Sequence, residues 1–247
     1  MRLLIAVKSC QRDLLDGAHE AIRETWGKNL PLNVDLLFFV GGENPPALQD
    51  DERHVLAPDG YWELHPKILE ILDYGVRHDY DFIDLCDTDT YFVISKLMSS
   101  GFENYDYSGG PINPKDAAFG VAYESTRTSS NYGNYVISPF YAYLSGGHGT
   151  ILSQRAAKLI VGAPRGLWNS EDLIIGQILG PGIQTGELKA KVLDNFANQI
   201  VHPDKSHGGP AAWHLGCGYY GGGHTDGRVN VSAALKKKHQ EITGENQ

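Results

Sequence analysis

The stretch FIDLCDTDT, at residues 82–90, decides the fold class of this 247-residue chain. Its first five residues, Phe82–Cys86, are apolar except for Asp84 and have the length of a buried β-strand. Two carboxylates follow at once, at Asp87 and Asp89. Parallel strands in α/β proteins bind their ligands at this end. The stretch therefore predicts a buried strand that ends in an acidic ligand-binding site.

Apolar patterns before this stretch predict two more strands and two helices. Buried strands are expected at Leu3–Val7 and Val34–Val40. Apolar residues recur every four positions from Leu14 to Trp26, as on one face of a helix, and a second helix is expected to begin at Pro66. The order β-α-β-α-β predicts a parallel sheet with helices on its faces.

The second half of the chain has a less regular pattern. Residues 109–139 and 208–227 are rich in glycine and aromatic residues, and we expect long loops there. Ser153 and Ser170 are candidate N-caps of two helices, the second of which would begin with Glu171 and Asp172. The last residues, 236–247, are expected to form a polar tail.

Composition and charge exclude several classes of protein. A net charge of −9 argues against broad binding to nucleic acid, because an acidic surface repels phosphates. Three cysteines are too few for a disulfide framework and lack the spacing of a zinc site. The first apolar run is too short for a signal peptide, and no membrane span is found. We therefore expect a cytoplasmic protein with no membrane partner.

The spacing of Asp87 and Asp89 favours a divalent cation. Two carboxylates that converge at a strand end supply the hard oxygen ligands that Mg²⁺ and Mn²⁺ prefer. A nucleoside diphosphate leaving group needs the charge neutralisation that such a cation provides. The alternative is a solvated turn in which an aspartate caps the next helix, and position alone does not separate the two.

Six elements resemble, in the same order, those of the inverting beta-1,3-glycosyltransferases that include fringe and core-1 galactosyltransferase. They are AIRETWG (21–27), LFFVG (37–41), DGYWELHPK (59–67), DTDTYFV (87–93), SGGHGTILS (145–153) and EDLIIG (171–176). Each is weak evidence alone, but their shared order is strong evidence. The chain departs from the pattern in Glu63, where the family has Asn, and in Thr88, which replaces a middle carboxylate. It also lacks the family's lumenal anchor and disulfides.

The resemblance implies a GT-A glycosyltransferase fold, which is an α/β fold with a Rossmann-like mixed sheet flanked by helices. A single catalytic domain would occupy residues 1–235, with a polar tail at 236–247. Within the domain, residues 1–93 would form the nucleotide-sugar-binding half, and residues 94–235 the acceptor-binding half.

The resemblance also implies roles for the acidic residues. Asp89 would ligate Mn²⁺ or Mg²⁺, and Asp87 would hold the donor ribose or complete the metal shell. Asp172 would be the general base that takes the proton of the acceptor hydroxyl. An ordinary first-turn acid, which stabilises the start of a helix, is the alternative for Asp172.

Other residues are candidates for the metal and donor sites. His202 fits best the metal-ligating histidine that the family places after this helix, with His207 and His214 as rivals; for each, an ordinary surface histidine is the alternative. Ser9, Arg23 and Lys67 are candidates for contacts with the donor nucleotide. For Arg23 and Lys67 a structural ion pair is an equal alternative.

The predicted reaction moves a hexose or an N-acetylhexosamine from a UDP-sugar to a hydroxyl acceptor. The acceptor would be a glycan, a small molecule, or a hydroxymethylated DNA base flipped out of its stack.

Two other classes of protein stay open. Asp87–Thr90 also contains the D-x-D part of the D-x-D-x-T motif of haloacid-dehalogenase-like phosphotransferases, with Asp87 as nucleophile. The other class is a non-catalytic sugar-binding module, against which the intact Asp87, Asp89 and Asp172 argue.

Overall fold

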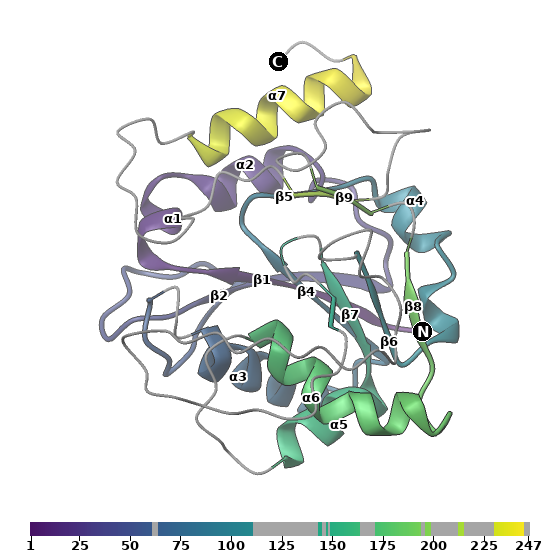
Figure 1. Ribbon diagram of the computed structural model, residues 1–247. Coiled ribbons are helices and arrows are strands. Elements are labelled where there is room, and N and C mark those ends of the chain that lie inside the picture. The colour runs from purple at the N-terminus through teal and green to yellow at the C-terminus, as the bar shows by residue number, and fades with distance from the viewer. Residues whose placement is uncertain are drawn as a thin grey trace, which may run out of the picture.

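A seven-stranded mixed sheet runs through the centre of the protein, and helices cover both of its faces (Figure 1). The computed structural model describes residues 1–60, 64–110, 143–144, 147, 149–163, 171–193, 196–198, 212–214 and 230–244. The sheet and its helices form one mixed α/β domain, which confirms the fold class predicted from the sequence.

The strands of the main sheet stand in the order β3-β2-β1-β4-β7-β6-β8. Their bounds are β1 Leu3–Ser9, β2 Val34–Val40, β3 Glu52–His54, β4 Phe82–Asp87, β6 Tyr107–Gly109, β7 Thr150–Ser153 and β8 Ala190–Val192. The first four strands are parallel, as predicted. Strand β7 runs antiparallel to both β4 and β6, so the sheet becomes mixed in its second half.

The helices form two layers on opposite faces of the sheet (Figure 1). On one face lie α3 Leu64–Arg77, α5 Gln154–Gly162 and α6 Glu171–Gln184. On the other lie α1 Gln11–Leu15, α2 Ala18–Glu24 and α7 Val231–Thr243, while α4 Ile94–Met98 and a short 3-10 helix at Phe102–Asn104 follow β4 and β5. Ser153 caps α5 as predicted, because its Oγ accepts a hydrogen bond of 3.2 Å from the Ala156 N–H.

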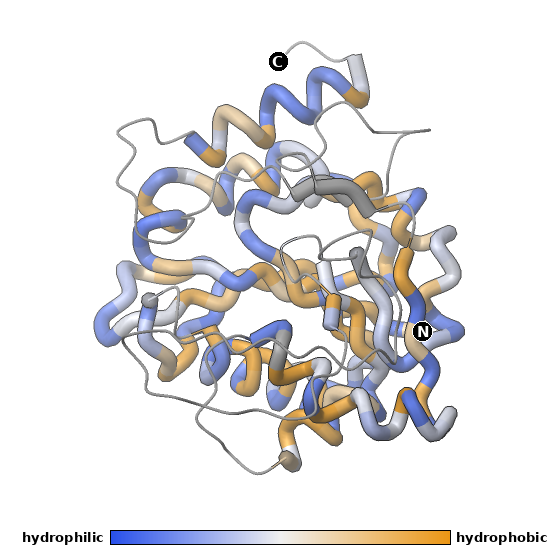
Figure 2. Tube along the Cα trace, viewed as in Figure 1, coloured by the Kyte–Doolittle hydropathy of each residue, from blue (hydrophilic) through white to orange (hydrophobic). Residues whose placement is uncertain are grey.

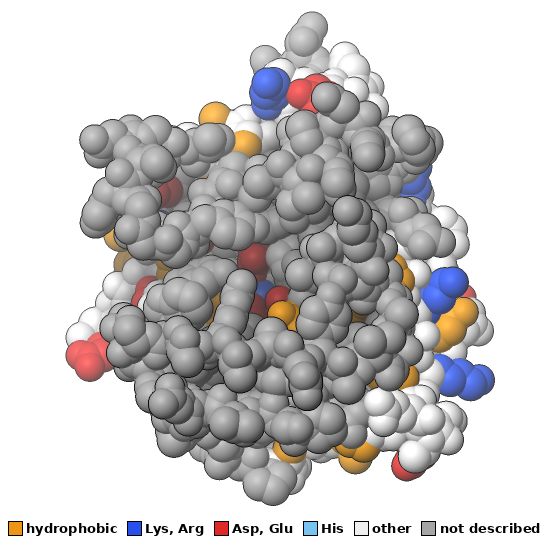
Figure 3. Space-filling model, viewed as in Figure 1, with side chains coloured by type: hydrophobic (Ala, Val, Ile, Leu, Met, Phe, Trp, Pro, Cys, Tyr) orange, Lys and Arg blue, Asp and Glu red, His pale blue; other side chains and the backbone are white. Residues whose placement is uncertain are grey.

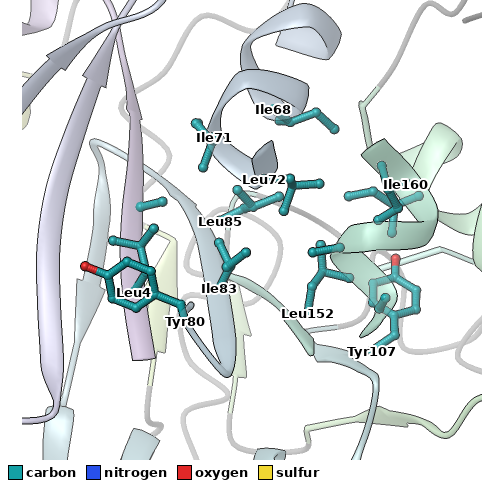
Figure 4. Packing of buried hydrophobic residues seen from close by; sticks show 14 of the residues in the cluster. Leu4, Ile68, Ile71, Leu72, Tyr80, Ile83, Leu85, Tyr107, Leu152 and Ile160 are labelled. Atoms are coloured by element: carbon teal, nitrogen blue, oxygen red, sulfur yellow. The ribbon is translucent and has the colours of Figure 1, made fainter. Parts of the chain in front are cut away.

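Each face of the sheet has its own hydrophobic core. Figure 4 shows one core, in which Ile68, Ile71 and Leu72 of α3 lie over the side chains of Ile83 and Leu85 of β4. The other core packs the opposite side chains of β1 and β4 against α2, α7 and the small sheet. Figure 2 shows the same division, with hydrophobic residues along the central strands and polar residues on the outer faces of the helices. Burial on both faces explains the continuous apolar runs of the parallel strands.

A second, three-stranded sheet lies beside the carboxyl end of β4. It contains β5 Thr90–Phe92, β9 Phe196–Asn198 and β10 Ala212–His214 in the order β5-β10-β9. Strand β5 begins directly after Asp89, and in the β5–β10 pair His214 stands opposite Thr90. The small sheet thus brings a distant part of the chain next to the acidic turn.

The expectation of a polar tail at residues 236–247 was wrong for most of that segment. Residues up to Thr243 belong to α7, which packs against α2. Leu235 is fully buried, and Tyr91 Oη lies 2.8 Å from Nδ1 of His239. The helix was missed because the aliphatic stem of Lys238, a residue only 7% exposed, supplies part of its inner face.

Among the helices that the structure describes, none has the length and hydrophobicity that crossing a membrane requires.

Candidate active site

The topological switch point of the sheet, where the strand order reverses, lies between the carboxyl ends of β1 and β4. From β1 the chain proceeds to β2 and β3 on one side, whereas β4 pairs with the other side of β1. In open α/β sheets this arrangement leaves a crevice outside the strand ends, where ligands bind. Figure 3 shows acidic side chains close to a basic one near the middle of this face, where Figure 1 places β1 and β4.

The acidic turn after β4 is fixed from two sides by its threonines. Thr88 Oγ1 donates a hydrogen bond of 2.8 Å to Oδ2 of Asp13, which lies in α1. Thr90 Oγ1 donates one of 2.7 Å to the carbonyl oxygen of Gly147 and accepts one of 3.2 Å from the Asp87 N–H. The turn is therefore an ordered part of the structure and not a loose solvated loop. Asp13 was not predicted, because nothing in its local sequence links it to position 88.

A buried lysine connects this turn to the start of α6. The ammonium of Lys8, on a side chain only 1% exposed, lies 3.0 Å from Oδ1 of Asp87 and 3.1 Å from Oε1 of Glu171. Burial alone would lower the pKa of Lys8, but the negative charges of Asp87, Glu171 and Asp172 outweigh it and hold that pKa well above its usual value. Lys8 is therefore an ammonium at neutral pH. The sequence analysis missed this residue.

Asp172 lies in the first turn of α6, near the groups that Lys8 joins. Its charge acts on Lys8 and also on Tyr107, whose pKa is raised mainly by burial. Tyr107 in turn accepts a hydrogen bond of 2.7 Å at its hydroxyl from the Leu144 N–H. The structure thus places Asp172, predicted as the base, and Asp87, predicted for the donor side, near the same lysine, Lys8.

Ser9 and Arg23, two of the predicted donor contacts, are ends of one buried chain of hydrogen bonds. Ser9 Oγ lies 2.6 Å from Nε2 of His19, and Nδ1 of His19 lies 2.7 Å from Oε1 of Glu52. The same Glu52 oxygen accepts a bond of 2.7 Å from Nη2 of Arg23. Arg23 also binds Asp51, at 2.6 Å. For Arg23 the structure therefore shows the ion-pair alternative.

Charge states within this chain are fixed by burial and by hydrogen bonding. Burial lowers the pKa of His19, so its imidazole is neutral at physiological pH. Burial would raise the pKa of Glu52, but hydrogen bonds from His19, the Gln49 N–H and Arg23 lower it. The neutral imidazole donates from Nδ1 to the Glu52 carboxylate, and its Nε2 accepts from the Ser9 hydroxyl.

Lys67 holds the loop that follows β1. Its ammonium donates to the carbonyl oxygen of Ser9 and lies 3.2 Å from Oδ1 of Asp59. The other Asp59 oxygen accepts a bond of 2.8 Å from the Gln11 N–H. Lys67 is only 2% exposed, so both of these contacts are internal. Asp59 is a further residue that the sequence analysis did not single out.

The predicted metal ligands are only partly described. Asp87 is 34% exposed at its side chain, and Asp89 is a buried residue in the same turn. His202 and His207 lie outside the described residues, and for His214 the structure gives the backbone position in β10 alone. Within the described part of the chain, no three His, Cys, Asp or Glu side chains gather as a metal site would require.

One buried carboxyl group lies outside all of these contacts. Asp84 of β4 is fully buried, and neither carboxyl oxygen has a hydrogen-bond partner among the described residues. Burial raises its pKa to about 8, although the positive charge of Lys8 opposes the shift. Asp84 is therefore mostly a neutral acid at pH 7.

Comparisons with known proteins do not identify the chain. No family model matches it, and no curated protein matches it. One similar solved structure is A197 from STIV, with 14% sequence identity and a TM-score of 0.38. That similarity covers 78% of this chain and 82% of A197. It is too low to support a functional assignment.

Proposed function

We propose that this protein is a metal-dependent glycosyltransferase that moves a hexose or an N-acetylhexosamine from a UDP-sugar to a hydroxyl acceptor. One observation carries the proposal. Asp87 and Asp89 follow the central strand β4 at the switch point of the sheet, and the charges of Asp87 and Asp172 both act on Lys8. Donor binding, metal binding and proton removal would then take place at one site on a GT-A type of fold.

The acidic turn fits a hard divalent cation, Mn²⁺ or Mg²⁺, through its carboxylate oxygens. Lys8 lies 3.0 Å from Asp87, and its positive charge disfavours a second cation at that carboxylate. We therefore assign direct metal ligation to Asp89 and contact with the donor ribose to Asp87. The bound ion would supply neutralisation of the charge that develops on the diphosphate leaving group. His202 is the proposed third ligand, and His214 becomes a stronger rival because β10 pairs with β5 beside Asp89.

Asp172 is the proposed general base. It would accept the proton of the acceptor hydroxyl as that oxygen attacks the anomeric carbon. Glu171, its neighbour, is bound to Lys8 and is thereby committed to a structural contact. If Asp172 is the base, while Asp87 and Asp89 serve the donor and the metal, the proposal predicts a single displacement with inversion, so an α-linked UDP-sugar gives a β-glycoside. Proton NMR of the anomeric coupling distinguishes the two products. An α-product from an α-linked donor would contradict the inverting assignment.

In this proposal Ser9, Arg23 and Lys67 do not contact the donor but hold the residues that would contact it. Lys67 donates to the Ser9 carbonyl, and Arg23 reaches the Ser9 hydroxyl through Glu52 and His19, so both support the carboxyl end of β1. The nucleotide would then contact the preformed loop that follows β1, with little reorganisation on binding.

The proposal is tested by supplying a panel of UDP-hexoses and UDP-N-acetylhexosamines with Mn²⁺ or Mg²⁺ and detecting hydrolysis or transfer by mass spectrometry. Candidate acceptors are simple glycans, small alcohols and hydroxymethylated DNA. Turnover should stop in excess chelator and return with added metal. Full turnover in chelator would refute the metal-dependent mechanism, and a phosphate ester trapped on Asp87 would support a phosphotransferase instead.

A further inference from the structure

Thr90 stands at a junction between three segments that are far apart in the sequence. It is fully buried and begins β5 directly after the Asp87–Asp89 turn. Its hydroxyl uses both of its hydrogen-bonding capacities: it accepts from the Asp87 N–H at 3.2 Å and donates to the Gly147 carbonyl at 2.7 Å. Its backbone lies opposite His214 in the small sheet.

We propose that Thr90 is a positioning residue whose hydroxyl joins the Asp87–Asp89 turn to the chain at Gly147 and so fixes both carboxylates. The inference rests on the proposed function, because it names a residue that orders the proposed donor and metal site. Thr90 itself acts through its neighbours and contacts neither the donor nor the metal in this account.

The geometry leaves the hydroxyl with few substitutes. A hydroxyl both donates and accepts at one atom, so the small Thr90 side chain can satisfy a backbone N–H and a backbone carbonyl together. Gly147 lies 57 residues along the chain, just before β7. β7 pairs with β4, so losing the hydroxyl would free both the turn and the entry to β7.

The hydrogen bond between Thr90 and Gly147 also explains how the donor and acceptor parts of the proposed site keep a fixed relative position. The turn presents the proposed donor and metal groups, whereas Gly147 belongs to the second half of the chain, assigned to the acceptor. A shift of about 1 Å between reacting groups can slow catalysis by about 10²-fold, so a rigid link between the halves has a direct catalytic value.

The test compares Thr90→Val, which keeps the shape and removes the hydroxyl, with Thr90→Ser, which keeps the hydroxyl. The matched control is Thr25→Val. Thr25 is also buried, and its hydroxyl donates a hydrogen bond of 2.5 Å to the carbonyl oxygen of Ala21. This bond lies within the end of α2 and joins no distant segments. Hydrogen exchange measured by mass spectrometry should rise in Thr90→Val at residues 85–92 and at residues 145–152. It should stay close to wild type at both segments in Thr90→Ser and in Thr25→Val.

Binding and turnover give a second readout. Thr90→Val should weaken the binding of Mn²⁺, measured by electron paramagnetic resonance, and slow UDP-sugar turnover by about 10- to 100-fold. Thr90→Ser should restore both. Unchanged exchange at residues 145–152 in Thr90→Val, or equal effects of the Val and Ser variants, would overturn the inference. If the wild type turns over no UDP-sugar, the proposed function fails, and the exchange comparison still decides whether Thr90 joins the two segments.

Discussion

Two buried polar networks begin at neighbouring residues of β1 and run to opposite faces of the sheet. Lys8 extends to one face and binds Asp87 and Glu171, whereas Ser9 extends to the other and leads through His19 to Glu52. Successive side chains of a strand point to opposite faces, which is why adjacent residues can serve unrelated networks. We call them the Lys8 network and the Ser9 network.

The two networks differ in how they end. The Ser9 network passes through the fully buried side chain of Glu52 and ends in a cluster of ion pairs, in which Arg23 binds Glu52, Asp51 and Glu20. The Lys8 network ends in carboxylates that reach the surface, with the Asp87 side chain 34% exposed. The Ser9 network orders the loop that follows β1, whereas the Lys8 network lies at the carboxyl end of β4 and includes Asp87. Under the proposed function, the Lys8 network would take part in the chemistry and the Ser9 network would support it.

Replacing Asp172 should have the largest effect on the chemistry. Asp172→Asn removes the proposed base, and loss of base catalysis typically slows a reaction by about 10²–10⁴-fold. UDP affinity, measured by calorimetry, should stay close to wild type. If the variant instead loses UDP affinity and keeps its turnover number, Asp172 belongs to the donor site and the assignment is wrong.

Asp84 belongs to neither network. It tests whether burial without a hydrogen-bond partner is enough to keep a carboxyl group neutral. Its pKa is raised by burial to about 8 in the folded protein, so the folded state holds this proton more tightly than the unfolded chain does. The free energy of unfolding should therefore fall as the pH rises from about 4 to about 8. Asp84→Asn removes this loss and should be more stable than wild type by about 4 kcal/mol at pH 7.

Urea unfolding of both proteins between pH 4 and pH 9 measures this difference. The two stabilities should be similar near pH 4, diverge up to about pH 8 and then run in parallel. A difference that is the same at every pH would show that Asp84 keeps an ordinary pKa.

Breaking the Lys8 network should cost stability as well as activity. Lys8→Met leaves Asp87 and Glu171 without their shared cation, and removal of one partner from a buried ion pair costs about 3 kcal/mol. The double variant Lys8→Met with Glu171→Gln should recover part of that loss, because one of the orphaned charges is gone. Lys28→Met, at an exposed position, is the control and should change stability little. An equally stable Lys8→Met would show that the pairs contribute nothing.

Breaking the Ser9 network should have the smallest effect on the chemistry. His19→Gln disturbs the hydrogen bonds to Ser9 and Glu52 and should lower the free energy of unfolding by about 2 kcal/mol. The turnover number of the folded fraction should change by no more than a few fold, with any change falling on the KM for the donor. A turnover loss as large as that of Asp172→Asn would place the Ser9 network in the chemistry and break the comparison.

The sequence predicted best the features that depend on local patterns. Strands β1, β2 and β4 were located to within about two residues, because each is a continuous apolar run buried on both faces. The Ser153 cap was also predicted, since it involves residues only three apart. The turn at Asp87 and Asp89 was expected at a strand end and lies there.

Features that depend on distant partners could not be predicted. Nothing in the sequence around Lys8 marks its role, because its partner Glu171 lies 163 residues away. His19 and Glu52 gave no apolar signal, although both are buried and 33 residues apart. Helix α7 was missed because much of its inner face is polar in sequence. In each case a buried polar residue is paired with another polar residue in the folded chain. A linear sequence pattern does not show such pairings.

The most direct test of the central claim measures UDP-sugar turnover with Mn²⁺ in three folded proteins: wild type, Asp89→Asn and Asp73→Asn. Asp73 of α3, whose side chain is 42% exposed and pairs with Arg77 in a surface contact, serves as the matched control. The account predicts that Asp73→Asn behaves as wild type, whereas Asp89→Asn loses about 10²-fold or more of its turnover, because an amide cannot replace an anionic ligand. Turnover in Asp89→Asn equal to that of wild type would contradict the claim that the turn after β4 is the metal and donor site.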